Sequence, residues 1–299
     1  MRRTDASPIT SRRQGAPENH ECYAPLPGHP VRGKFQVPDI FSLAIAILMA
    51  ISSVMALLNP EMVYPNRDLV RAFLANDVAN LAVGLPALLF AMWLARRGAL
   101  AGLLLWPGSL LYVQYNYLVP LLCAPFNQAS AIHLALVTIS LYTTMALVAA
   151  VSESEVKERL AGFVPEKLGG AAMVVLAIVT LARTITLMAT HLHNGSPIGA
   201  TDLALAIADT LMAPAWLIGG ILLWKRSSFG YLAAPGLLLE ASMLFAGLIV
   251  FLIVQQLITG AGTGLAGPLM IGGMGLIVFI PFGLFLRGMA RRGCFVSRP

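Results

Sequence analysis

The sequence predicts an all-α polytopic membrane protein with eight transmembrane helices, built as two parallel four-helix repeats. Composition, the number of long apolar windows and an internal duplication support this prediction. Of the 299 residues, 58% are hydrophobic and only 11% are charged, whereas an average soluble domain has roughly 45 to 50% apolar and 25% charged residues. This excludes a soluble globule, and three cysteines are too few for a disulfide scaffold.

Eight windows are each long and apolar enough to cross a bilayer, which takes ~20 residues. The two halves of the chain contribute four windows each, separated by a charged stretch. The predicted spans are 39–58, 74–95, 99–122, 130–151, 168–190, 202–224, 229–257 and 266–287.

Positive charge predicts the orientation of these spans, because short cytoplasmic loops carry the excess of Lys and Arg. With the N-terminus inside, every basic residue falls on the cytoplasmic side except Arg67 and Arg71, in an outer loop, and Arg183, within a span. The net charge of +6 therefore reflects topology and gives no reason to expect nucleic-acid binding. We expect a prokaryotic cytoplasmic (inner) membrane protein with both termini cytoplasmic.

Three segments outside the spans are predicted to lie on the cytoplasmic side. Residues 1–38 contain many prolines and no long apolar run, which is typical of a disordered tail. Residues 152–167 form a solvated amphipathic linker, and 288–299 form a C-terminal tail. Because no apolar segment precedes the first span, that span is expected to act as a retained signal anchor.

An internal duplication appears when the chain is shifted by 128 residues, with ten identities in 27 residues without a gap. The most informative matches are Pro86 with Pro214, Gly102 with Gly230, and the Pro-Gly pair at 107 with that at 235. Because each copy has four spans, the second copy returns in the orientation of the first. The repeats, 39–151 and 168–287, are expected to be related by a pseudo-two-fold axis along the membrane normal, as in some transporters. The alternative is a duplicated bundle whose interface serves packing only.

Polar residues gather at one depth of the predicted spans, toward the outer side. Charged groups within spans cost roughly 3 kcal/mol on insertion scales, so they normally face protein or water. Counting residues from the outer span ends at 1.5 Å per residue places most of them ~10 Å deep. We expect them to form an outward-facing polar pocket between the repeats, lined by Asp77, Asn80, Tyr112, Gln114, Asn116, Arg183, Asp209 and Glu240.

Charge balance indicates what this pocket binds. One arginine, Arg183, faces three carboxylates, and unpaired carboxylates in a low dielectric must bind protons or find a cation. We expect Asp209 to pair with Arg183 and Glu240 to titrate. The repeat aligns Glu240 with Tyr112, which suggests an asymmetric site. The alternative is that these groups only form interhelical hydrogen bonds and one buried ion pair that fixes helix register.

Catalytic and metal-binding signals are weak. His133, His191, His193 and Asp202 fall near outer span ends, and imidazole with carboxylate suits zinc or copper, but their spacing is not diagnostic of a metal site. No Gly-x-Ser-x-Gly element occurs, and no cofactor is expected.

Three function classes follow from these observations. The duplication and the carboxylate excess favour a proton- or cation-coupled carrier of a small solute. A non-catalytic scaffold, sensor or assembly factor is the first alternative, and a membrane-embedded enzyme or redox protein is the second. The sequence favours a role that is not enzymatic, with the lipid bilayer and a small solute or cation as partners.

Overall fold

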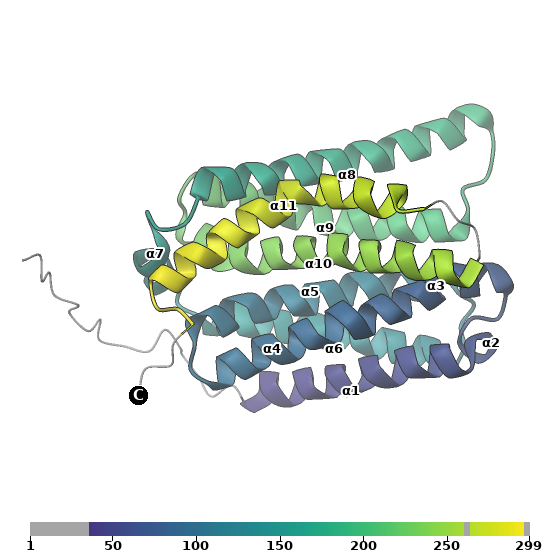
Figure 1. Cartoon of the computed structure of the whole chain (residues 1–299), viewed down its shortest axis with the longest axis horizontal. Coiled ribbons are helices and arrows are strands. Elements are labelled where there is room, and N and C mark those ends of the chain that lie inside the picture. The colour runs from purple at the N-terminus through teal and green to yellow at the C-terminus, as the bar shows by residue number, and fades with distance from the viewer. Residues whose placement is uncertain (1–35, 260–263, 296–299) are drawn as a thin grey trace, which may run out of the picture.

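The computed structural model describes residues 36–259 and 264–295, and within these residues all regular structure is helical (Figure 1). Most helices run roughly along one axis of the molecule. Two short helices, α2 and α7, lie at opposite ends. The elements are α1 (Gln36–Leu58), α2 (Pro60–Val63), α3 (Arg67–Ala79), the π-helix η1 (Asn80–Gly84), α4 (Leu85–Arg96), α5 (Leu100–Cys123), α6 (Gln128–Ala150), α7 (Glu153–Leu160), α8 (Glu166–Asn194), α9 (Ala200–Trp224), α10 (Ser228–Thr259) and α11 (Ala266–Arg291).

Seven helical segments of the described residues are long and apolar enough to cross a membrane. They are α1, the continuous segment α3–η1–α4, α6, α8, α9, α10 and α11. The chain is therefore an all-helical, multi-pass membrane protein. Helix α5, expected as a further span, is not among the seven. Its tyrosines, Gln114 and Asn116 lower its hydropathy, and 16 of its 24 residues are buried within the protein.

Some helix ends differ from the sequence prediction. The second predicted span begins at Arg67 and not at residue 74, because Asn66 caps the helix by accepting a hydrogen bond from the Leu69 amide at 2.8 Å. Arg67 and Arg71, expected in a loop, therefore lie in helical turns. Helix α11 continues to Arg291, inside the expected C-terminal tail. Of the expected N-terminal tail, residues 1–35 lie outside the described residues.

The two ends of the bundle differ in charge. One end carries α7 and the last turn of α11 (Figure 1), and we call it the basic end. The opposite end, which carries α2 and the α8–α9 turn, is called the α2 end. The basic residues in the loops and terminal helical turns of the basic end are Arg96, Arg97, Lys157, Arg159, Lys167, Lys225, Arg226, Arg287, Arg291 and Arg292.

Helices α5 and α10 pack against each other in the middle of the bundle. Gly108 of α5 lies against the backbone of Gly236 in α10, so closely that a Cβ at position 108 would overlap the Gly236 carbonyl. Glycine permits this approach because it has no side chain. These two residues are 128 positions apart, so equivalent positions of the sequence repeat are in contact.

The turns before α5 and α10 have the same backbone structure. In the first turn, Ala99 N–H donates to the Leu94 carbonyl at 3.1 Å, and in the second, Ser227 N–H donates to the Leu222 carbonyl at 2.9 Å. Each turn has one residue in the left-handed region: Gly98, with φ of 73°, and Arg226, with φ of 56°. All of these positions correspond under the 128-residue shift.

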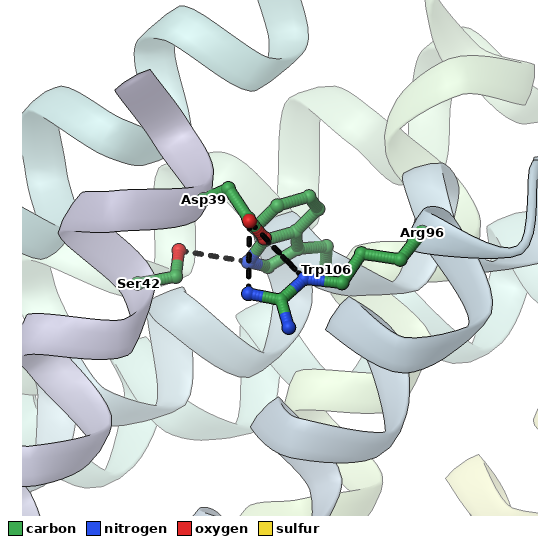
Figure 2. A network of polar contacts seen from close by, with 4 residues as sticks. All are labelled: Asp39, Ser42, Arg96 and Trp106. Carbon is green, nitrogen blue, oxygen red and sulfur yellow. Dashed lines mark hydrogen bonds and ion pairs between the residues drawn. The ribbon is translucent and has the colours of Figure 1, made fainter. Parts of the chain in front are cut away.

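Polar contacts near the basic end attach α1 to α4 and α5 (Figure 2). The Arg96 guanidinium donates two hydrogen bonds of 2.8 Å to the Asp39 carboxylate. One turn deeper, Trp106 Nε1 donates to Ser42 Oγ at 2.9 Å. These contacts fix the position of α1 relative to α4 and α5.

Candidate functional site

The predicted polar residues do not form one pocket but two clusters separated by α5. Tyr115 contributes to one cluster and Tyr117 to the other. Residues two apart on an α-helix point about 200° apart, so these two hydroxyls leave α5 in nearly opposite directions. The depth of each residue was predictable from the sequence, whereas its side of α5 was not.

The Asp209 cluster consists of Tyr115, Arg183, Asp209, Trp216 and Glu240. Arg183 Nη2 of α8 forms an ion pair with Asp209 Oδ2 of α9, which confirms the predicted pairing. Tyr115 donates to the other carboxylate oxygen of Asp209 at 2.7 Å. The Asp209 side chain is only 6% exposed, but that of Arg183 is 51% exposed. The arginine therefore enters the cluster from the surface.

Glu240 lies deepest in the Asp209 cluster and is fully buried. Trp216 Nε1 of α9 donates to its Oε2 at 2.7 Å, while its Oε1 has no hydrogen-bond partner among the described residues. Asp209 is near enough to act on Glu240 as a like charge. Arg183 therefore pairs with Asp209 alone, and Glu240 has an oxygen left for a proton or a cation.

The Asp77 cluster, on the other side of α5, consists of Ser53, Tyr64, Asp77 and Tyr117. Asp77 accepts hydrogen bonds from Ser53 Oγ at 2.9 Å and from Tyr64 Oη at 2.7 Å. Tyr117 Oη lies 3.0 Å from Ser53 Oγ. Burial, and then the neighbouring Asp77, raise the pKa of the Tyr64 hydroxyl well above its ordinary value, so it stays protonated and donates. Both Asp77 oxygens have partners, so this cluster is satisfied internally.

Tyr112 of α5 lies between η1 and α10, and Asn80, at the start of η1, lies beside Tyr117 of the Asp77 cluster. Tyr112 is packed tightly: a Cβ at Gly84 would come within 2.7 Å of its ring, and one at Gly247 within 2.9 Å of its hydroxyl. The Tyr112 hydroxyl and Asn80 Oδ1 are buried without a hydrogen-bond partner among the described residues. Asn80 begins the π-helix η1, an irregularity that is frequent at functional sites.

Like Asn80 and Tyr112, the predicted site residues Gln114 and Asn116 belong to neither cluster. Gln114 donates to Thr144 Oγ1 of α6 at 3.2 Å. The Asn116 amide donates to the Tyr112 carbonyl of its own helix at 3.0 Å. Both were predicted to line the pocket because of their depth in the span. In the structure, Gln114 contacts a neighbouring helix and Asn116 contacts the backbone of its own helix.

The candidate metal ligands are not brought together. His133 lies beside the Asp77 cluster, with its Nε2 3.0 Å from Ser52 Oγ and its ring against Tyr117. His191, expected in a loop with His193, lies with it in the last turn of α8, where its Nδ1 is 3.0 Å from Ser196 Oγ. Asp202 is in the first turn of α9. Within the described residues, no group of three His, Cys, Asp or Glu side chains could hold a metal ion.

The predicted site residues did not include Ser53, Tyr64, Tyr115, Tyr117 and Trp216. Ser53 carried a usable signal, because counting depth along the first span as well places it at the level of the other polar residues. Tyr64 lies between helices, in a stretch predicted to be an outer loop, and nothing in the sequence indicated its contact with Asp77. Trp216 is apolar over most of its surface, so only the structure identifies its N–H as a donor to Glu240.

Comparisons with protein-family models, with curated proteins and with solved structures found no match to this chain.

Proposed function

We propose that the protein is a proton- or cation-coupled carrier of a small solute, with its binding site at the Asp209 cluster. The observation that carries this proposal is Glu240, which is fully buried and has one carboxyl oxygen without a partner among the described residues. A bare carboxylate in such a place costs several kcal/mol, and proton or cation binding removes that cost. Arg183 already balances the charge of Asp209, so the exchangeable proton or cation belongs to Glu240.

The proposed architecture has α5 as an eighth span and two parallel four-helix repeats, residues 39–151 and 168–287. The matching turns before α5 and α10, and the contact between the equivalent Gly108 and Gly236, support it. Both turns lie at the basic end, as parallel repeats require. The Asp209 cluster then draws Tyr115 from the first repeat and its other members from the second, so it lies between the repeats.

The proposed orientation follows from charge, with the basic end on the cytoplasmic side of a prokaryotic inner membrane and both termini there. The α2 end then faces outward. Arg183 and Asp209 lie nearer to the α2 end of their helices, and the Arg183 side chain is half exposed. This supports a pocket that opens outward. Tyr112 is proposed to line its far wall. Asp77 lies across α5 with partners of its own, and the contacts of Gln114 and Asn116 argue for packing roles.

Proteoliposomes that enclose a pH-sensitive dye test this proposal. Pools of sugars, amino acids, organic acids and metal ions are added outside, and proton entry is followed, with ²²Na⁺ uptake as the cation readout. We expect one pool to drive ion entry, Glu240→Gln to abolish it, and Glu240→Asp to retain part of it. Glu153→Gln, at an exposed acid of α7, is the matched control and should change nothing. Ion entry that is unchanged in Glu240→Gln, or absent with every pool, would contradict the proposal.

A further inference from the structure

We infer that Arg183 binds the oxyanion head group, a phosphate or a carboxylate, of an amphiphilic molecule that approaches from the lipid along the exposed surface of α8. This inference rests on the proposed function and names the substrate class of the same site. It depends on the position of Arg183 in its helix, on its unused donors, and on the exposed apolar surface around it.

Arg183 is held at depth in an apolar surface. It lies 11 residues from the last residue of α8, or ~16 Å along the axis. Its neighbours Val179 and Ile185 are 51% and 66% exposed, so apolar residues flank it on both sides. An arginine in this position normally extends its side chain toward the membrane surface. Here the ion pair with Asp209 prevents that, and half of the side chain is exposed at this depth.

The guanidinium has donors to spare. Arginine has five N–H donors in a planar fork that matches phosphate and carboxylate oxygens in bidentate geometry. The structure gives Arg183 one partner among the described residues, Asp209. Asp209 also accepts from Tyr115, so it keeps a hydrogen bond when the arginine turns to an external anion. In addition, the Thr184 hydroxyl is buried without a partner in the same turn of α8.

Arg183 lies in the half of α8 that is least covered by the rest of the protein. Near the other end of α8, a Cβ at Gly169 would lie 3.3 Å from Leu223 of α9, 3.6 Å from Leu238 of α10 and 3.8 Å from Phe285 of α11. Toward the α2 end, α8 rises away from α11 (Figure 1). Beyond Ala177, Thr184 is the only described residue of α8 that is buried. At the level of Arg183, α8 is therefore mostly exposed, while its ion pair with Asp209 keeps it attached to α9.

The apolar surroundings indicate the source of the anion. The span windows of α8 and α11 are each 22% buried, the lowest value among the candidate spans, so both helices expose apolar surface. A hydrocarbon tail fits that surface, and a strongly hydrated free anion does not. The ligand is therefore an amphiphile, with its head group at Arg183 and its tail on the exposed apolar surface of α8.

The test is a thermal melt of the full chain in an uncharged maltoside detergent, with dioctanoyl phosphatidic acid as the probe. We expect a saturating rise of about 5 °C in the midpoint, because a ligand that binds only the folded state stabilises it. Dioctanoylglycerol supplies the tail alone, and inorganic phosphate supplies the anion alone. Neither is expected to raise the midpoint by more than about 1 °C at the same concentration.

Variants assign the effect to Arg183. Arg183→Gln should abolish the rise, and Arg183→Lys should weaken it because the bidentate fork is lost. The double variant Arg183→Gln/Asp209→Asn removes both charges together, so it remains folded and should also show no rise. Arg67→Gln, at an exposed arginine of the α2 end, is the matched control and should respond as the natural chain does.

Several results would overturn the inference. An undiminished rise in the double variant would place the head group elsewhere, and an equal rise with inorganic phosphate would place the anion in water. Glu240→Gln separates this inference from the proposed function, because Glu240 does not contact Arg183 in the proposed binding mode. Probe binding without Glu240-dependent ion entry would refute the carrier alone, and ion entry without probe binding would refute the inference alone.

Discussion

Arg183 and Asp209 are the pair that connects the surface of the bundle to its interior. The two residues come from different helices and differ in exposure, 51% against 6% for their side chains. Removing the arginine leaves a buried carboxylate with Tyr115 as its remaining partner. The energetic effect of each residue therefore depends on whether the other is present.

A mutant cycle measures this dependence. We expect Arg183→Ala to lower the free energy of unfolding by about 2 kcal/mol, less than the 3 to 5 kcal/mol of a fully buried pair, because Arg183 is half exposed. The double variant Arg183→Ala/Asp209→Ala should recover more than half of this loss, since no unpaired charge remains. The measurement is reversible unfolding in detergent, with Arg67→Ala as the surface control. Additive single effects would show that the two residues are not coupled.

Side-chain depth was predictable from the sequence, but the partners of each side chain were predictable only in part. Arg183 and Asp209 were paired correctly because opposite charges at one depth on consecutive spans have few other partners. Asp77 was expected to share their pocket, yet it faces Ser53 and Tyr64 on the other side of α5. Counting along a helix gives height, whereas the rotation of each helix depends on packing with its neighbours.

At the scale of elements, the turns before α5 and α10 are the clearest structural repeat. Corresponding hydrogen bonds close both turns, and both need a residue with positive φ. The first turn has Gly98 at this position, but the second has Arg226. A residue with a Cβ pays roughly 1 to 2 kcal/mol in this conformation, so the second turn is strained relative to the first.

Exchanging the residue type at this position should shift stability in opposite directions. Gly98→Ala is expected to lower the free energy of unfolding by about 1 kcal/mol, and Arg226→Gly to raise it by about 0.5 kcal/mol. The loss of the exposed Arg226 side chain costs little, because its nitrogen is 4.0 Å from Glu166 and 62% of the side chain is exposed. Unfolding in detergent measures both changes.

Gly273→Ala is the control for this pair of variants. Gly273 is helical, and a Cβ there would meet nothing within 4 Å, so alanine should be neutral or slightly stabilising. If Gly98→Ala behaved like Gly273→Ala, the shared turn conformation would not be the one described here.

Most helix positions followed from apolar windows, and the exceptions have physical causes. The second span begins seven residues early because charged residues in its first turns resemble a loop, while the Asn66 cap shows that the backbone is already helical. Helix α5 was predicted from its length and from the parity of the basic loops. Its tyrosines, Gln114 and Asn116 lower its hydropathy, and most of its residues are buried against neighbouring helices.

For the whole molecule, membrane orientation is the property that most of the proposed function depends on. A truncated chain fused to alkaline phosphatase reports it, because the enzyme is active only outside. With the basic end cytoplasmic, we expect activity for fusions after Asn127 and Gly195 and none after Gly98 and Gly162. Each active position has an inactive counterpart at the other end of the bundle.

Two outcomes of the fusion experiment would require revision. Activity after Gly162 and none after Gly195 would reverse the orientation, and with it the outward opening near Arg183. Equal activity after Gly98 and Asn127 would mean that α5 does not cross the membrane. The proposed parallel arrangement of the two repeats would then be contradicted as well.

In the proposed two-repeat architecture, the contact between Gly108 and Gly236 is the point around which one repeat can tilt relative to the other. Backbone touches backbone there, so the halves can pivot around this point more easily than they can slide past it. From this contact to Cys123, the end of α5, the lever arm is ~22 Å, and to Tyr115 it is ~10 Å. A tilt of about 10° would move the far end of α5 by about 4 Å and the Tyr115 level by about 2 Å. Such a tilt would widen the outer entrance of the proposed pocket and would displace the Asp209 cluster only slightly.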